Sequence, residues 1–344
     1  MKRERCLRVA VVGAGSIGAH RARLCSAAPG VELVGVLDRN PERAREVAAR
    51  YGAPVWSERE LAAESLDAAV ISVPTEAHVE VGAPLLERGV ALLVEKPIAA
   101  SLAEADSLIA IARRTPALLQ IGHTERFNPA VEVLRQVCKQ PRFIEAHRLG
   151  SFQARSLDID VILDLMIHDI DVVLNLVRSE VERIDAVAVQ ALTARLDIAN
   201  ARLMFANGAA ANLTASRISV GKVRKLRIFE PHNYLSLDYT QQEVLHYTLS
   251  SSPGGGAPQI ISRTLPVSRR EPLAREMEAF FSAVCDGSAP IVDGAQGRRA
   301  LEVSLEIGRC VAEAHERGRS SAERASPVEP RDPRQEPRAQ RSSS

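Results

Sequence analysis

The sequence lacks a charge excess, paired cysteines and long hydrophobic runs. Its 344 residues carry 44 basic and 43 acidic side chains, which leave a formal net charge of +1. Proteins that bind nucleic acid usually have a strongly basic domain or stripe, so this balance argues against that class. No apolar stretch approaches the roughly 20 residues that cross a bilayer. We therefore expect no nucleic-acid partner and no membrane association.

The cysteines are few and scattered, with no C-x-x-C pair and no histidine-rich segment beside them. The five are Cys6, Cys25, Cys138, Cys285 and Cys310. This pattern contains no zinc signature and is typical of free thiols in a reducing compartment. The start, MKRERCLRVAVVGAG, imitates a signal peptide, but its short apolar run leads directly into a glycine motif. We predict a cytoplasmic protein without a metal site, in which this run is a buried strand.

The first 122 residues alternate between aliphatic runs and helical stretches rich in alanine, arginine and glutamate. The runs are residues 7–12, 31–37, 68–73, 90–94 and 117–121, and the helical stretches include 41–51 and 101–114. Runs of this kind are typical of parallel strands buried on both faces. Their alternation with helices indicates βαβ units and a doubly wound sheet. We predict a Rossmann domain over residues 1–122.

The pattern changes after residue 123. Two helical segments, 128–139 and about 160–177, precede a mainly strand-like region from 181 to about 267, and helices return at 272–285 and 296–316. Turns such as Asn207-Gly208 and Pro231-His232-Asn233 suit a large, mainly antiparallel sheet. We predict an α/β domain for substrate binding and oligomerisation over residues 123–317. One sheet face left open favours a homodimer or homotetramer. Residues 318–344, rich in Ser, Pro, Arg and Glu, are predicted to be a disordered tail.

A glycine motif joins the first predicted strand to the first predicted helix. Its residues, Gly13-Ala14-Gly15-Ser16-Ile17-Gly18, fit G-x-G-x-x-G. Such glycines permit a tight turn and let backbone N–H groups approach a pyrophosphate at the positive end of the helix. Asp38 follows the second strand, where its carboxylate can accept hydrogen bonds from an adenosine ribose. Asp38 should repel a 2′-phosphate, which favours NAD over NADP, although Arg39 could accept that phosphate.

An ordered set of further motifs resembles the Gfo/Idh/MocA oxidoreductases. In chain order the motifs are GAGSIGAH, SVPTEAH, EKPIA, GHTERFNP, LDLMIHDID, PLAREMEAFF and GRRALEVSLEIG. The resemblance covers almost the whole chain apart from the tail. It implies a nicotinamide-dependent dehydrogenase that acts on a CH–OH group of a sugar, an inositol or a derivative.

Lys96 is the first residue to which the resemblance gives a chemical role. A lysine at the carboxyl end of a parallel strand projects into the crevice where doubly wound sheets bind ligands. A solvated lysine before a proline turn is the alternative. The resemblance implies that Lys96 orients the substrate hydroxyl and lowers the cost of its deprotonation.

Asp164 and His168 form the second chemical pair, in an otherwise apolar helical run. Together with Asp171 they are spaced by four and three residues, which places them on one stripe of a helix. Buried polar groups must be hydrogen-bonded or functional, so a satisfied core histidine is the alternative. The family's D-x-x-x-H pattern maps onto Asp164 and His168. It implies that His168, with a pKa near the working pH, takes the hydroxyl proton. Asp164 would hold the alcohol or orient the base, and we interpret Asp171 as structural.

The resemblance also implies contacts around these residues. It places the turn Ser72-Val73-Pro74-Thr75, with His78 on the next helix, beside the nicotinamide half of the cofactor, and it adds Glu95 and Lys96 to the cofactor contacts. Arg126 and Asn128 fall at the domain junction. There we predict that they bind substrate together with Lys96, Asp164 and His168. A surface salt bridge is the alternative for Arg126.

Four segments narrow the range of expected substrates. HTERFNP, RFIEAHRLGSF, DIDVILDLMIHDID and YLSLDY are similar to bacterial UDP-N-acetylglucosamine 3-dehydrogenases. This implies oxidation of the sugar 3-hydroxyl to a ketone for later transamination, on the route to lipid A diamino sugars, with a sugar aminotransferase as pathway partner. Basic residues available for a diphosphate are Arg155, Arg217, Lys222, Arg224 and Lys225. The alternatives are an inositol or simple sugar dehydrogenase and a non-catalytic regulator that senses dinucleotides.

Overall fold

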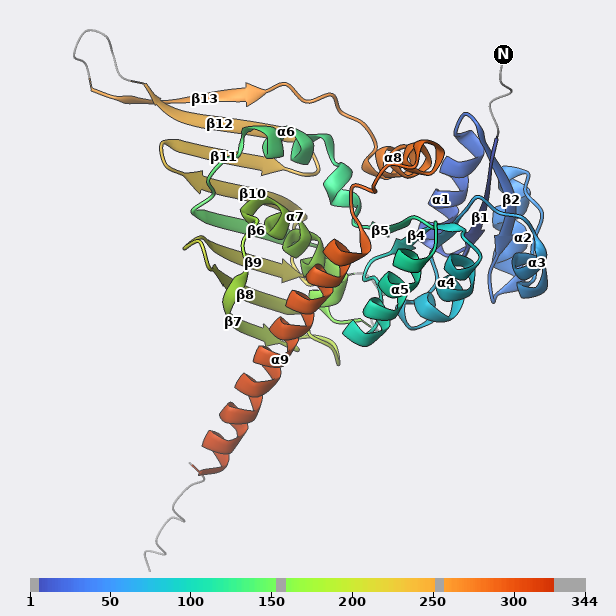
Figure 1. The fold of residues 1–344 in the computed structure, drawn as a ribbon. Helices are drawn as coiled ribbons and strands as arrows, with labels where there is room; N and C mark the ends of the chain where they lie inside the picture. Colours follow the sequence, from blue (N-terminus) through green and yellow to red (C-terminus); the bar gives the residue numbers. More distant parts are fainter. Residues whose placement is uncertain (1–5, 153–158, 251–256, 325–344) are drawn as a thin grey trace, which may run out of the picture.

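The computed structural model describes residues 6–152, 159–250 and 257–324, which fold around two β-sheets (Figure 1). The first sheet is parallel, with the order β2-β1-β3-β4-β5, and apolar clusters pack on both of its faces. Its strands are β1 (Leu7–Val12), β2 (Val31–Leu37), β3 (Ala68–Ile71), β4 (Ala91–Glu95) and β5 (Leu119–Gly122). The helices along this part are α1 (Ser16–Ala27), α2 (Pro41–Tyr51), α3 (Glu58–Ala63), α4 (His78–Glu87) and α5 (Leu102–Arg114). The predicted Rossmann-type sheet is confirmed.

Local capping explains where several of these helices begin. The side chain of Asn40 accepts hydrogen bonds from two backbone N–H groups at the start of α2, and Pro41 occupies the first helical position. Ser101 and Glu104 form a capping box at the start of α5. Gly15 is the N-cap residue of α1, and no side chain of the described residues caps this helix. Its first N–H groups are therefore available to a ligand.

The described part of the second sheet has eight strands in the order β13-β12-β11-β10-β6-β9-β8-β7. All neighbouring pairs are antiparallel except β6 and β9, which run parallel. The strands are β6 (Phe143–Leu149), β7 (Val181–Val189), β8 (Ile198–Phe205), β9 (Ala210–Ser216), β10 (Val223–Glu230), β11 (Asn233–Asp238), β12 (Glu243–Ser250) and β13 (Gln259–Leu265). Gly208 in the turn between β8 and β9 has a φ of 79°, which glycine tolerates. The predicted large, mainly antiparallel sheet is confirmed.

Helices cover one face of this second sheet. Figure 1 shows α6 (Pro129–Val137), α7 (Ile167–Val177) and α9 (Gly294–Arg324) on the side that faces the Rossmann sheet. Among the described helices, none lies on the opposite face (Figure 1). Aromatic rings of β6, β10, β11 and β12 stack in a row on that face, with neighbouring centroids 4.7 to 5.7 Å apart. We call Phe143, Phe229, Tyr234 and Tyr247 the aromatic row.

The predicted regular helix over residues 160–177 is wrong in its first part. A π-helical turn, η3 (Ile162–Met166), precedes α7, and it contains Asp164. A π-turn inserts one extra residue into the helical repeat and is frequent at functional sites. Asp164 is therefore rotated away from the regular stripe that His168 and Asp171 share on α7.

The last two helices cover both sheets. Helix α8 (Pro272–Asp286) packs on α1 and buries Met277, Phe280 and Phe281 in a core of the Rossmann sheet. Helix α9 packs against α5 and α7 and runs to Arg324, since no proline interrupts it before Pro327. Helix α9 therefore extends into the tail that is predicted from residue 318, and residues 325–344 of that tail lie outside the described residues. None of the described helices has the length and apolar character of a membrane span.

A buried arginine connects α1, β4 and α8. The guanidinium of Arg21 is completely buried and lies 2.7 Å from a carboxylate oxygen of Glu95 and 2.6 Å from one of Glu276. The hydroxyl of Thr124 also donates to Glu276, at 2.9 Å. Burial, with the like charge of Glu95, raises the pKa of Glu276 to about 7, although Arg21 opposes this shift. Two carboxylates from different parts of the chain thus share one cation.

We predict that Arg21→Leu lowers the free energy of unfolding by about 3–5 kcal/mol, because it leaves the buried Glu276 and the partly buried Glu95 without their cation. Arg23→Leu is the matched control, since it removes an exposed ion pair with Glu271 from the same helix. That control should change stability by less than about 1 kcal/mol. Urea denaturation followed by circular dichroism measures both, and equal losses would contradict the assigned role of Arg21.

Candidate active site

Three glycines shape the turn between β1 and α1, each for a different reason. Gly13 has a φ of 96°, and a Cβ there would lie 2.3 Å from the carbonyl oxygen of Ser72. A Cβ at Gly18 would lie 1.7 Å from the carbonyl oxygen of Gly13. At Gly15 a Cβ would meet no atom of the described residues within 4 Å. Open space before an uncapped helix fits a pyrophosphate, as the motif predicts.

The Asp38 carboxylate stabilises this turn through hydrogen bonds. It accepts hydrogen bonds from the backbone N–H groups of Ala14 and Asn40, both at 2.7 Å, and pairs with Arg43 at 2.9 Å. Burial alone would raise the pKa of Asp38, but these donors lower it below its usual value. The carboxylate is therefore ionised at neutral pH. The neighbouring Arg39 is exposed and lies 3.3 Å from Glu80.

A cavity of about 540 Å³ opens beside the turn, which is within the range of ligand sites. Of the predicted cofactor residues, those that line it are Gly13, Gly15, Asp38, Arg39, Ser72, Val73 and Pro74. Ala14, Ser16, Ile17 and Gly18 shape the turn behind it, and Thr75 begins the 3-10 turn η1 (Thr75–Ala77). The cavity thus joins three segments that are separate in the sequence and that we predict to bind the dinucleotide. Lys96, Asp164 and His168 do not line it.

Two predicted cofactor residues have partners within the protein. The ring nitrogens of buried His78 lie 3.2 Å from the carbonyl oxygen of Ile98 and 3.1 Å from that of Val73. His78 does not line the cavity and instead joins the loops after β3 and β4. Glu95 pairs with Arg21. We therefore give both residues a supporting role, in which they position the backbone around the site.

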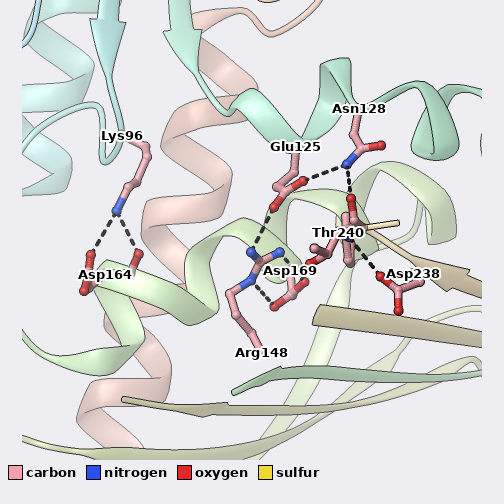
Figure 2. A network of polar contacts seen from close by, with 9 residues as sticks. Lys96, Glu125, Asn128, Arg148, Asp164, Asp169, Asp238 and Thr240 are labelled. Carbon is pink, nitrogen blue, oxygen red and sulfur yellow. Dashed lines mark hydrogen bonds and ion pairs between the residues drawn. The ribbon is translucent and has the colours of Figure 1, made fainter. Parts of the chain in front are cut away.

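Lys96 and Asp164 meet where the end of β4 approaches η3 (Figure 2). The Lys96 Nζ donates to the main-chain carbonyl of Asp164 at 2.8 Å and lies 3.5 Å from its Oδ1. Burial lowers the pKa of Lys96, and the nearby Asp164 carboxylate opposes that shift. The ammonium retains further N–H groups for a substrate oxygen. The structure thus brings Lys96 and Asp164, which the sequence analysis treats separately, into direct contact.

His168 lies in the first turn of α7, among cations. Burial lowers its pKa well below the usual value of 6.5, and the charges of Lys96 and Arg148 add to that shift. The predicted pKa near the working pH is therefore wrong, because the surroundings of His168 are both enclosed and positive. The ring is neutral and has a lone pair that can accept a proton.

Arg148 is the central residue of this site that the sequence analysis misses. It is buried on β6 and pairs with both oxygens of Asp169, at 2.8 and 2.9 Å, and with Glu125 at 2.9 Å (Figure 2). Its guanidinium also lies 5.1 Å from the ring centroid of Tyr239. The sequence feature that could have indicated Arg148 is the alternation of side chains along a strand. Ile144 and Ala146 lie on the same buried face of β6 as Arg148.

The side chains of Arg126 and Asn128 both make contacts within the protein. Arg126 pairs with Asp171 at 3.2 Å, and both side chains are 3% exposed. Asn128 caps α6, and its amide donates to Glu125 and to the carbonyl of Tyr239 (Figure 2). Neither contact is the surface salt bridge that we considered for Arg126. We propose that both residues position the site rather than touch the substrate.

Comparisons with known proteins agree with this architecture. Residues 7–123 match the oxidoreductase family with an NAD-binding Rossmann fold, and residues 135–230 match the Gfo/Idh/MocA C-terminal domain. UDP-N-acetylglucosamine 3-dehydrogenase from Acidithiobacillus ferrooxidans is 38% identical over 302 residues, which cover 88% of this chain and 96% of that protein. The chain belongs to the Gfo/Idh/MocA family. It is an oxidoreductase of the dehydrogenase type that acts on CH–OH groups, as the resemblance implies.

Two further comparisons place the chain within the Gfo/Idh/MocA family. The solved structure of the A. ferrooxidans enzyme superposes with a TM-score of 0.84 and covers 89% of this chain and 97% of that one. The scyllo-inositol 2-dehydrogenase (NAD(+)) of Bacillus subtilis is 26% identical over 328 residues, with 88% of this chain and 93% of that protein covered. Similarity to the inositol enzyme is thus lower than similarity to the nucleotide-sugar enzyme.

The open space at Gly15 generates a prediction about the cofactor. Gly15→Val should preserve the fold but lower the affinity for NAD at least about tenfold, because the new side chain enters the space meant for the pyrophosphate. Calorimetric titration with NAD and thermal unfolding measure the two effects. Gly18→Val is the comparison variant, and it should lower thermal stability because its Cβ collides with backbone. Unchanged NAD affinity in Gly15→Val would refute the placement of the pyrophosphate.

Proposed function

We propose that this protein oxidises the 3-hydroxyl of UDP-N-acetylglucosamine, with NAD as the hydride acceptor. The observation that carries the proposal is the 38% identity to UDP-N-acetylglucosamine 3-dehydrogenase along almost the whole of that protein. A 3-keto sugar is a substrate for transamination. We therefore propose a sugar aminotransferase as the next enzyme, on the route to lipid A diamino sugars. The proposed location is the cytoplasm, where the five free cysteines remain reduced.

The roles of the polar residues follow from their contacts. Bound NAD would supply the site that accepts the hydride. Lys96 Nζ, anchored to Asp164 at 2.8 Å, would donate to the substrate oxygen and stabilise the negative charge that develops there. Neutral His168 would accept the hydroxyl proton. The Asp164 carboxylate, 3.5 Å from Nζ, would hold the ammonium in place.

Charge around the ribose end of the cavity supports NAD over NADP. Asp38 is ionised, and its charge would repel a 2′-phosphate. The two arginines beside it already face carboxylates, since Arg43 pairs with Asp38 and Arg39 with Glu80. A phosphate would have to displace these pairs.

Arg224 is the cation that we propose for the substrate diphosphate. It lies on β10 in register with Arg148 of β6, and both residues are on the face covered by helices. Arg148 is paired with two carboxylates, whereas the side chain of Arg224 has no hydrogen bond or ion pair within the described residues. Burial and the charge of Arg148 lower the pKa of Arg224. Binding of an anion would therefore stabilise this arginine.

The other basic candidates are less suited to this role. Arg217 donates to the carbonyl of Ile159 at 2.5 Å. Lys225 lies on the opposite face of β10 and is 3.7 Å from Asp238. Lys222 is exposed just before β10, and Arg155 lies outside the described residues. Arg224 is thus the candidate that combines partial burial with free donors near His168.

The substrate proposal is tested by turnover. The enzyme with NAD should convert UDP-N-acetylglucosamine to a 3-keto product, detected by mass spectrometry with an aminotransferase and an amine donor as a trap. Turnover with NADP should be lower. His168→Ala should reduce turnover by roughly 10²–10⁴ while NAD affinity stays within a few-fold. Oxidation of inositol or free N-acetylglucosamine without oxidation of the UDP-sugar would eliminate this substrate.

Arg224 has a matched control on its own strand. Arg224→Met should raise the KM for UDP-N-acetylglucosamine about tenfold or more, because a charge-assisted contact worth about 1.5–3 kcal/mol is lost. Arg227→Met removes an arginine from the opposite face, where it lies 3.6 Å from Glu145, and should leave KM unchanged. Inhibition by UDP should weaken in parallel in Arg224→Met alone. Equal KM values for both variants would remove Arg224 from the substrate site.

We propose that the aromatic row buries itself against a second copy of the chain, giving a dimer or tetramer. The four rings are half-buried and lie on a sheet face that no described helix covers, so part of their apolar surface is available for association. The double variant Tyr234→Lys/Tyr247→Lys should be monomeric in light scattering, because charge would enter the centre of the row. Val220→Lys, at a fully exposed position outside the row, should assemble like the parent protein. A monomeric parent protein at micromolar concentration would refute this proposal.

A further inference from the structure

Buried polar atoms without partners gather behind the proposed base. Within the described residues, both ring nitrogens of His123, the Nδ1 of His168 and the Oδ2 of Asp171 are enclosed and have no hydrogen-bond partner. His123 is only 1% exposed, and Asp171 is 3% exposed. Enclosed polar atoms are costly to leave unpaired, and native proteins rarely do so. Atoms of this kind on three neighbouring side chains therefore require an explanation.

These side chains come from two elements that pack together. His123 immediately follows β5, beside the end of β4 that carries Lys96, and it begins the 3-10 turn η2 (Thr124–Phe127). His168 and Asp171 lie three residues apart on one face of α7, which contacts η2. Arg126 stabilises this contact between η2 and α7. Its N–H donates to the carbonyl of His123 at 3.0 Å, and its guanidinium pairs with Oδ1 of Asp171 at 3.2 Å.

Donors and acceptors in this group match in number. His168 can accept a hydroxyl proton at Nε2 only if its neutral ring carries the other proton on Nδ1. That Nδ1–H needs an acceptor, which one nitrogen of His123 could provide, directly or through a water. The second nitrogen of His123 would then carry a proton and donate to Oδ2 of Asp171. In that arrangement all the unpartnered atoms of the three side chains would be satisfied.

We propose that His123 is a positioning residue, which links Nδ1 of His168 to the Asp171 carboxylate directly or through one enclosed water. The proposal rests on the proposed role of His168 as the base. His123 thereby selects the tautomer of His168 that leaves Nε2 free for the substrate. When His168 takes up the hydroxyl proton, the carboxylate of Asp171 offsets the new charge through the ring of His123.

The surrounding charges are consistent with this arrangement. Burial lowers the pKa of His123, so its ring stays neutral at neutral pH, with one donor and one acceptor nitrogen. The charged groups that act on the two rings, from η2, α7, β6, β10 and the end of β4, are Glu95, Lys96, Arg126, Arg148, Asp171 and Arg224. The carboxylate of this set on α7 is Asp171, on the same helical face as His168.

The test compares three variants near the end of β5. His123→Phe keeps a ring but removes both nitrogens, and it should lower kcat about 10²-fold while the KM for NAD stays within a few-fold. His123→Asn or His123→Gln should recover kcat to within about tenfold of the parent protein, because an amide can accept from His168 and donate to Asp171. Gln120→Met is the control. It removes another buried side chain on β5, whose amide has no hydrogen-bond partner within the described residues, and kcat should not change.

A second readout needs no substrate. In ¹⁵N NMR of histidine-labelled protein, the His168 ring should carry its proton on Nδ1 in the parent protein and in Gln120→Met, and on Nε2 in His123→Phe. Unchanged tautomers in His123→Phe, or a parent His168 protonated on Nε2, would overturn the proposal. The parent spectrum alone shows which nitrogen of His168 carries the proton, so it tests the proposal even if His123→Phe does not fold. Failure of the enzyme to oxidise a UDP-sugar would instead remove the proposed function and leave this measurement valid.

Discussion

The arrangement of the site depends on one buried cation, Arg21, that two carboxylates share. Glu95 ends β4 immediately before Lys96, and Glu276 lies on α8, which follows the second sheet in the sequence. Arg21 itself lies on α1, whose N-terminus faces the cofactor cavity. A single guanidinium therefore fixes α1, the backbone before Lys96 and α8 relative to one another. Unpaired burial of any of these charges would be costly, which makes the connection specific.

Charge is distributed unevenly around the base. Arg148 is enclosed by Asp169 and Glu125, whereas Arg224 in register beside it has no such pair in the described structure. Arg148, which is paired, lines the site, and the side chain of Arg224 remains able to bind an anion. Their combined positive potential also keeps His168 neutral. The same charges that favour an anionic substrate thus keep the base in its proton-accepting form.

Local sequence signals predicted the Rossmann half well. Asn40 and Pro41 define the start of α2, and its end at Tyr51 precedes Gly52 in a left-handed conformation. These features depend on a few adjacent residues, so the sequence contains them directly. The π-turn at Asp164 was not predictable in this way, because its wider hydrogen-bonding pattern arises from packing between η3 and its neighbours. Helix α9 continues to Arg324, beyond the helix predicted over residues 296–316, because no proline interrupts the intervening Ser- and Arg-rich segment.

Sequence alone determined the family, the glycine motif and the candidate residues Lys96, Asp164 and His168, since each is a short pattern at a definite strand or helix end. Only the tertiary structure decided what those residues contact. Arg126 faces Asp171 and His78 faces two carbonyl groups, so residues that looked available for ligands are occupied by the protein. The positions of Arg148 and His123 beside His168 depend on the packing of β5, β6 and α7, which no local pattern indicates. Burial and ion pairing depend on residues far apart in the chain, and these set the pKa of His168 and the partners of every charged group around it.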